Sequence, residues 1–251
     1  MTTDAIAERF VIGLDDTDTP ESGGTGKLAR SLVAQFVADG LGASLGVTRH
    51  QLLDHPKIPM TKRNSCNAVA VESASSLNDV EDWAVRFVRQ HAERGADPGV
   101  AILSRHSDMP HVLAFGRRCQ QELMKLDDAG TFSAEANVRL RALGGKRLGS
   151  IGALAAVGLR AGGGDGRYVD LRGLRDLTGR MTAGQIRATS EVQRILDEAT
   201  GEPLDRDDMV DTADWIRPRL FEGGPLLMTR RSTEERRLWL PVDRHEEHHD
   251  G

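Results

Sequence analysis

The chain has 251 residues, of which 39% are hydrophobic and 28% are charged. This composition is typical of a globular protein with one large domain or two modest ones. A net charge of -5 and an aromatic content of 4% argue against a generally basic nucleic-acid surface and against broad base-stacking surfaces. The N-terminal residues lack the regions of a signal peptide, and the longest apolar run, near residues 151–159, is too short to cross a bilayer. We therefore expect a cytoplasmic protein without a membrane partner.

The two cysteines, Cys66 and Cys119, are far apart in the sequence and form no C-x-x-C motif. That spacing excludes a zinc ribbon. We expect both to be buried free thiols.

In the first half of the chain, short apolar runs alternate with amphipathic segments. This alternation predicts an α/β core. We expect strands over residues 9–14, 43–48, 67–73 and 99–104, and helices over 27–39 and 79–95, the first of them ending at Gly40.

The second half of the chain has a more helical pattern up to a glycine-rich stretch at residues 161–166, which is a candidate junction between domains. The expected elements are helices over 117–128, 133–144, 151–161 and 183–199, and strands over 225–230 and 237–242. We expect one domain over residues 1–160, a second over 167–243, and a disordered tail over 244–251.

Three carboxylates follow the first predicted strand, at Asp15, Asp16 and Asp18. At a separation of roughly 6 Å, each pair repels by about 1–3 kcal/mol, and a bound cation offsets that cost. Mg²⁺ prefers oxygen ligands and often binds one or two carboxylates together with substrate phosphates. Ligands of open α/β folds also bind at the carboxyl ends of strands. The pattern therefore predicts a magnesium site, with a solvated turn as the alternative.

A glycine-rich turn follows the carboxylates and leads into a helix whose first turn contains Lys27, a candidate ligand of the nucleotide. Glycines let backbone N–H groups approach a phosphate, and the helix contributes the positive end of its dipole. Thr25 lies at the start of this helix. It has either a chemical role or the structural role of an N-cap.

Two basic segments could contact a phosphorylated ligand. The first contains Arg63 and precedes the strand at 67–73, and the second precedes the apolar helix at 151–161. Glycines combined with Lys and Arg at a helix start favour oligophosphate binding. The candidates in the second segment are Lys146, Arg147, Gly149 and Ser150.

Taken together, these segments resemble a known family, the archaeal isoleucine-tRNA agmatinylcytidine synthetases (agmatidine synthases, TiaS). The stretch "IGLDDTDT" resembles the family's G-I-D-D-T-D-S, and "LGSIGALAAVG" resembles its G-L-I-G-A-L-A-A-V-G. Two further segments, "IPMTKRNSCNAV" and "ADPGVAI", are similar to I-P-x-K-T-R-G-N-x-A-V and N-P-G-x-x. A fainter match continues through "DTADWIRPRLFEGGPLLMTRR", so that the resemblance extends over nearly the whole chain.

The resemblance implies a kinase-like α/β core followed by a shortened α+β (ferredoxin-like) second domain. It also implies that ATP phosphorylates a carbonyl oxygen of cytosine, that the amine of agmatine displaces this phosphate, and that the enzyme phosphorylates itself on a threonine. That threonine corresponds to Thr25 here. By the same resemblance, Asp15, Asp16 and Asp18 would hold Mg²⁺ against ATP, while Arg63, Lys146 and Arg147 would bind phosphate oxygens.

The chain departs from the family at two points. The family's Cys-Thr-Thr is Gly24-Thr25-Gly26 here, and no segment corresponds to its oligonucleotide-binding fold or zinc ribbon. We therefore expect an ATP- and Mg²⁺-dependent phosphoryl-transfer enzyme that acts on a small amine or nucleoside-like acceptor. The alternatives are a tRNA-modifying synthetase that acts with a partner and a non-catalytic nucleotide-binding regulator.

Overall fold

The computed structural model describes residues 7–22, 24–59, 63–213 and 215–242. The chain divides into two compact units, Met1–Val169 and Asp170–Gly251. Strand β6 (Arg167–Asp170) lies at the division and begins directly after the glycine-rich stretch at 161–166. The predicted tail at 244–251 lies outside the described residues.

The first unit is built on a sheet of strand order β5-β4-β1-β3-β2. Every neighbouring pair in this order is antiparallel, so the rule that places ligands at the carboxyl ends of parallel strands does not apply here. The strands are β1 (Glu8–Asp15), β2 (Ala43–Gln51), β3 (Ser65–Ser73), β4 (Gly99–Leu103) and β5 (Arg139–Ala142).

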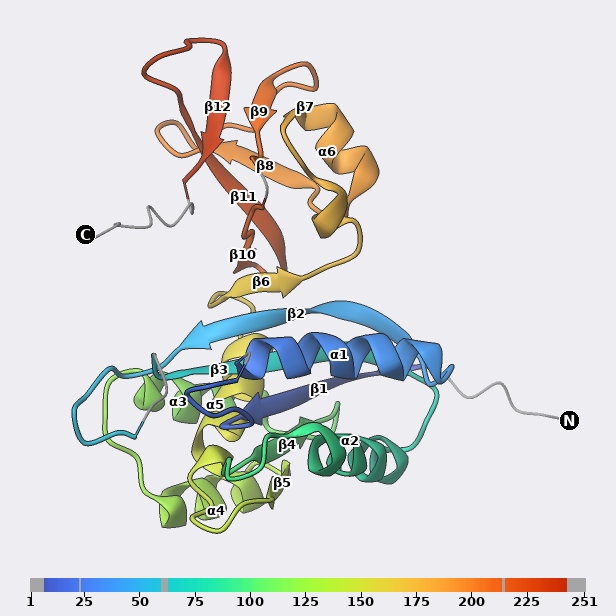
Figure 1. Ribbon diagram of the computed structural model, residues 1–251, viewed down its shortest axis with the longest axis vertical. Coiled ribbons are helices and arrows are strands. Elements are labelled where there is room, and N and C mark those ends of the chain that lie inside the picture. Colours follow the sequence, from blue (N-terminus) through green and yellow to red (C-terminus); the bar gives the residue numbers. More distant parts are fainter. Residues whose placement is uncertain (1–6, 23, 60–62, 214, 243–251) are drawn as a thin grey trace, which may run out of the picture. The chain divides into compact units, whose positions relative to one another are not determined.

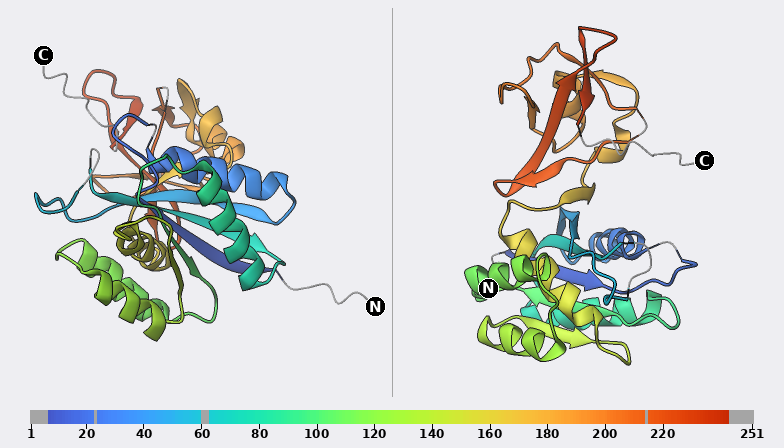
Figure 2. Two further views of the ribbon diagram at one scale, coloured as in Figure 1. Left: turned by 60° about the horizontal axis from the view of Figure 1, so that its bottom comes forward. Right: turned by 90° about the vertical axis from the view of Figure 1, so that its left-hand side faces the viewer.

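Helices cover both faces of this sheet (Figures 1 and 2). The helices α1 and α2 pack on one face over a core that includes Leu14, Leu32 and Phe36. On the other face, α3 and α4 pack against α5, which lies directly on β1, β3 and β4. The bounds are α1 (Thr25–Ala38), α2 (Leu77–His91), α3 (Met109–Cys119), α4 (Leu126–Glu135) and α5 (Gly149–Ala161).

Most elements of the first half lie where the sequence pattern places them. Gly40 follows α1 with a φ of 70°, the left-handed conformation that ends a helix, and its N–H donates to the carbonyl of Val37. Ser76 and Asp79 form a capping box at the start of α2. The α/β class expected from the sequence is confirmed.

Two predicted helices of the second half of unit 1 are wrong. The expected helix over 117–128 is interrupted, because α3 ends at Cys119 and α4 begins only at Leu126. The expected helix over 133–144 contains β5 instead, because Asn137 takes a left-handed φ of 53° after α4 and the chain then runs extended alongside β4. The side chains of Arg139 and Arg141 form ion pairs with Glu81 of α2.

The second unit is richer in strands than the sequence pattern indicated. The expected helix over 183–199 is wrong after Thr189, since residues 194–197 pair in parallel with β11. Among its described residues, the unit contains one α-helix. The elements are η1 (Leu174–Asp176), β7 (Arg180–Thr182), α6 (Ala183–Thr189), β8 (Arg194–Asp197), β9 (Met209–Asp211), β10 (Arg219–Phe221), β11 (Gly224–Arg231) and β12 (Leu238–Pro241).

Both cysteines are buried and free, as predicted. Burial raises the pKa of the Cys119 thiol to about 12, which leaves it protonated at neutral pH. None of the helices in the described residues has the length and apolar character needed to cross a membrane.

Candidate functional site

The acidic turn begins at the last residue of β1. Asp15 pairs across the sheet with Gly99 of β4, and Asp16 then takes a left-handed φ of 51°. A non-glycine residue in this conformation costs about 1–2 kcal/mol. This backbone conformation occurs where the side chains of Asp15, Asp16 and Asp18 take different directions.

The carboxylate of Asp15 lies on the α5 face of the sheet. A methyl group at Gly152 would overlap that carboxylate, so glycine is required in α5 where the helix crosses β1. Burial raises the pKa of Asp15 well above its usual value, and the charges of Asp16 and Asp18 raise it further. The α5 motif seen in the sequence therefore has a packing role next to the acidic turn.

The carboxylate of Asp18 lies on the other side, at the start of α1. The hydroxyl of Thr25 donates to Asp18 Oδ1 at 2.7 Å and accepts from the Thr17 hydroxyl at 3.1 Å and the Thr17 N–H at 3.3 Å. The N-cap of α1 is Gly24, and Thr25 is the first helical residue with 7% of its surface exposed. The N-cap interpretation of Thr25 is therefore wrong, because its hydroxyl binds a carboxylate rather than a helix N–H.

The three carboxylates do not converge on a common metal position. Within the described residues, no group of three or more His, Cys, Asp or Glu side chains is arranged to hold a metal ion. The reason is that the strand directs Asp15 towards α5, whereas the turn closed between Thr19 and Ser22 brings the start of α1 back to Asp18. The donor set fits a magnesium ion that one or two of these carboxylates share with substrate phosphates, and it does not fit a three-carboxylate ion site.

Asp16 connects the acidic turn electrostatically with the loop before α5. Burial raises the pKa of Asp16 above its usual value, and the charges of Asp97 and Asp18 add to the effect. The charge of Lys146 acts in the opposite direction. The structure thus brings Lys146, one of the predicted phosphate ligands, within electrostatic range of the acidic turn.

The backbone N–H groups of this loop already have an acceptor. The carboxylate of Asp97 accepts from Lys146 at 3.1 Å, from Arg147 at 2.9 Å and from Leu148 at 2.7 Å. Asp97 is 8% exposed, and its oxygens occupy the positions that a phosphate would need. The exposed side chains of Lys146 and Arg147 remain to bind a ligand.

Gly149 and Ser150 have structural roles in the start of α5. The backbones of Asp97 and Gly99 leave no room for a side chain at Gly149. The hydroxyl of Ser150 donates to the carbonyl of Arg147, which has a left-handed φ of 64°. These contacts hold the loop in place, so the hydroxyl of Ser150 is engaged by the loop itself.

The two remaining predicted ligands have exposed side chains. Lys27 is exposed in the first turn of α1, and Arg63 is exposed just before β3. Sequence reasoning did not identify Asp97 as a site residue. The only sequence signal for it was its position in "ADPGVAI", directly before β4.

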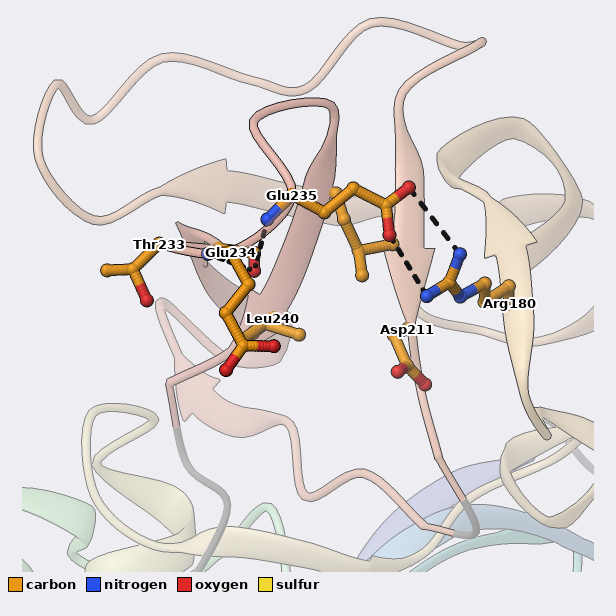
Figure 3. A pocket seen from close by; sticks show the side chains of 8 residues that line it. Arg180, Asp211, Thr233, Glu234, Glu235 and Leu240 are labelled. Atoms are coloured by element: carbon orange, nitrogen blue, oxygen red, sulfur yellow. Dashed lines mark hydrogen bonds and ion pairs between the residues drawn. The ribbon is translucent and has the colours of Figure 1, made fainter.

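A separate hollow lies in the second unit and contains none of the predicted site residues (Figure 3). Its volume is about 550 Å³. Arg180 of β7 forms an ion pair with Glu235 at 3.0 Å across part of it, and both side chains are exposed. The hollow is lined by Arg180, Asp211, Ser232, Thr233, Glu234, Glu235, Leu238 and Leu240. Because this hollow contains none of the predicted site residues, we place the candidate site at the acidic turn.

Comparison with known proteins supports a TiaS-like fold. No family model matches the chain. An uncharacterized protein of Methanocaldococcus jannaschii is 29% identical over 155 residues, which cover 61% of this chain and 50% of that relative.

The solved structures that are similar to this chain include three with the same coverage, 60% of this chain and 36% of the other. The complex of TiaS with an isoleucine tRNA and ATP has 26% identity and a TM-score of 0.53. A tRNA fluorescent labeling enzyme has 25% identity and a TM-score of 0.53, and the complex of TiaS with the same tRNA, AMPCPP and agmatine has 25% identity and a TM-score of 0.52. The chain spans half the length of the curated relative and little more than a third of each solved chain. Over the part that aligns, it has the fold of TiaS.

Proposed function

We propose that this chain is an ATP-dependent phosphoryl-transfer enzyme in which the hydroxyl of Thr25 accepts a phosphoryl group. The observation that carries the proposal is the hydrogen bond of 2.7 Å from the Thr25 hydroxyl to the carboxylate of Asp18. A general base must lie within hydrogen-bond reach of the proton that it removes, and Asp18 meets this condition. The fold similarity to TiaS, which has been solved with ATP and with AMPCPP, supports ATP as the donor.

In the proposed step, the Thr25 oxygen forms a bond to the γ-phosphorus while the bond from that phosphorus to the bridging oxygen breaks. The proton of the hydroxyl passes to Asp18, and ADP leaves. The backbone N–H groups at the start of α1 and the side chain of Lys146 would offset the negative charge of the transferring group. Mg²⁺, held by Asp16 or Asp18 together with the phosphates, would supply further charge neutralisation.

We propose that ATP also donates its γ-phosphoryl group to a second acceptor, a carbonyl or hydroxyl oxygen of a small nucleoside-like compound, and that ADP leaves. Phosphorylation makes that oxygen a good leaving group, so an amine can attack the carbon and release inorganic phosphate. The structure of TiaS with agmatine supports an amine as the nucleophile. A tRNA acceptor bound with the help of a partner is the alternative that the same comparisons support.

The experiment is incubation of the chain with ATP and Mg²⁺, followed by intact-mass spectrometry and measurement of ADP. We expect one added phosphate in the wild type and none in Thr25→Val. Removing this hydroxyl leaves a buried N–H of Thr17 unpaired, which costs about 1–3 kcal/mol. Asp18→Asn therefore serves as a second variant, expected to fold and to lose at least 100-fold in rate, in line with general-base catalysis.

The matched control is Thr131→Val, which changes an exposed threonine in α4 and should behave as the wild type does. Stoichiometric nucleotide binding without ADP release in any buffer would show a non-catalytic nucleotide-binding protein and refute the proposal. Once ADP release is established, nucleosides, amines and tRNA are screened as acceptors.

A further inference from the structure

Two polar side chains that the sequence did not single out face the start of α1. Leu14 of β1, Asn67 of β3 and Arg49 of β2 are directly opposite one another in register. Directly opposite residues of antiparallel strands point to the same face of a sheet. Since Leu14 belongs to the core beneath α1, Asn67 and Arg49 lie on the α1 face, on the other side of the sheet from the carboxylate of Asp15.

The side chain of Asn67 is buried without a hydrogen bond to its amide oxygen. The residue is 2% exposed, and Oδ1 has no partner among the described residues. A Cβ placed on Gly26 would lie 3.4 Å from this oxygen, so the amide is directly against the first turn of α1. An unpaired buried amide oxygen is destabilising and rare in native proteins, so this amide can gain a bond from a ligand donor, or from a ligand acceptor if its NH₂ group turns to that side.

Among the described residues, no side chain caps the N–H groups at the start of α1. Gly24 makes no side-chain capping bond, and the first turn contains no acidic residue. The hydroxyl of Thr25 is used by Asp18 rather than by the helix. The N–H groups of Thr25 and Gly26 therefore have no side-chain acceptor among the described residues, and they lie at the positive end of the helix dipole, in the turn that Asn67 contacts.

Positive charge surrounds this position. Arg49 Nε donates to Ser65 Oγ at 2.9 Å, which fixes the guanidinium at the end of β3. Partial burial lowers the pKa of Arg49, and the nearby charge of Arg63 lowers it further, whereas Asp18 raises it. The Arg49 guanidinium thus lies within electrostatic range of Asp18 and of Arg63, and the Thr25 hydroxyl already engages the Asp18 carboxylate.

We propose that the N–H groups of Thr25 and Gly26, the amide of Asn67 and the guanidinium of Arg49 form a binding subsite for a phosphate-class anion. A half-turn of the amide exchanges Oδ1 and Nδ2, so that Asn67 can donate to a phosphate oxygen. The subsite would hold the phosphoryl group next to the hydroxyl of Thr25. This inference rests on the proposed function only in taking ATP as the source of the phosphoryl group. Binding of an inorganic anion at the subsite requires no catalysis.

The experiment is thermal unfolding of the full chain with and without inorganic pyrophosphate, in the absence of added metal. We expect pyrophosphate to raise the Tm of the wild type in a saturable manner. Asn67→Val should have a Tm at least as high as the wild type without ligand, because it removes an unpaired amide and places a β-branched residue in a strand. The same variant should lose the pyrophosphate effect.

Two further variants and one control complete the test. Arg49→Met should weaken pyrophosphate at least tenfold, and Asn67→Asp should abolish binding because it adds a negative charge. Arg9→Met, which changes an exposed arginine of β1 (side chain 78% exposed), should bind as the wild type does. A lower Tm in Asn67→Val together with an intact pyrophosphate effect would show that Asn67 is only a packing residue, and no stabilisation of the wild type would overturn the subsite.

Parallel measurements with ATP separate this inference from the proposed function. Pyrophosphate binding that depends on Asn67, without phosphorylation of Thr25 by ATP, would support the subsite and refute the enzyme. Phosphorylation of Thr25 at the wild-type rate in Asn67→Val would refute the subsite and leave the enzyme intact.

Discussion

Asp97 offers a direct test of how the loop before α5 is held. Its carboxylate is almost fully buried and accepts three backbone N–H groups, two on Oδ1 and one on Oδ2. Asp97→Asn preserves the size of the side chain but replaces one oxygen with an NH₂ group, which cannot accept. The smallest loss arises when the NH₂ group replaces Oδ2, and the N–H of Leu148, whose bond of 2.7 Å is the shortest of the three, then loses its acceptor.

The expected loss follows from that single bond. A hydrogen bond to a charged group contributes about 1.5–3 kcal/mol, so we expect the free energy of unfolding to fall by that amount. For a chain of this length the Tm should fall by about 3–12 °C. Asp97→Ala should cost more, because all three N–H groups lose their partner.

The assay is urea unfolding followed by circular dichroism, with Asp82→Asn as the control. Asp82 is an exposed acid in α2, and its substitution should change the free energy of unfolding by less than about 0.5 kcal/mol. If Asp97→Asn is as stable as the wild type, the carboxylate does not hold the loop and the reasoning is refuted. If it holds the loop, the KM for ATP should rise in Asp97→Asn, since Lys146 is no longer fixed near Asp16.

Two other predictions concern packing and pH. Gly152→Ala should lower the free energy of unfolding by about 1–3 kcal/mol, because its methyl group meets the carboxylate of Asp15. Gly130→Ala, at an open position in α4, should raise the free energy of unfolding by about 1 kcal/mol. Urea unfolding of both variants checks this prediction, and equal effects would contradict it. Burial lowers the pKa of His50 despite its hydrogen bond of 2.7 Å to Asp165. As the pH falls, His50 therefore takes up its proton in the unfolded chain at a higher pH than in the folded chain. The free energy of unfolding should then decrease below about pH 6.5, by up to about 1.4 kcal/mol per pH unit. Unfolding at several pH values should show this slope in the wild type, and an equal slope in His50→Gln would rule out His50 as its source.

The sequence by itself determined the elements whose periodicity is local and uninterrupted. The apolar stripe from Leu28 to Phe36 predicted α1, and the apolar run from Ile151 to Leu159 predicted α5. The carboxylates at the end of β1 were also evident as a candidate site, because like charges at such spacing are unfavourable without a partner. These inferences need only the order of residues along one segment.

The tertiary structure decided which of these groups meet. A strand pattern contains no information on the direction of its neighbours, so the antiparallel sheet and the strand β5 were not predictable from local periodicity. The same applies to Asp97, which takes the N–H groups expected to bind phosphate, and to Asn67, whose position against α1 depends on the register of β3 with β1. Asp15 and Asp18 are three residues apart in sequence, yet one lies against α5 and the other against α1. Side-chain direction at the end of a strand is set by pleat and by the turn that follows, and both depend on pairing partners that lie far along the chain.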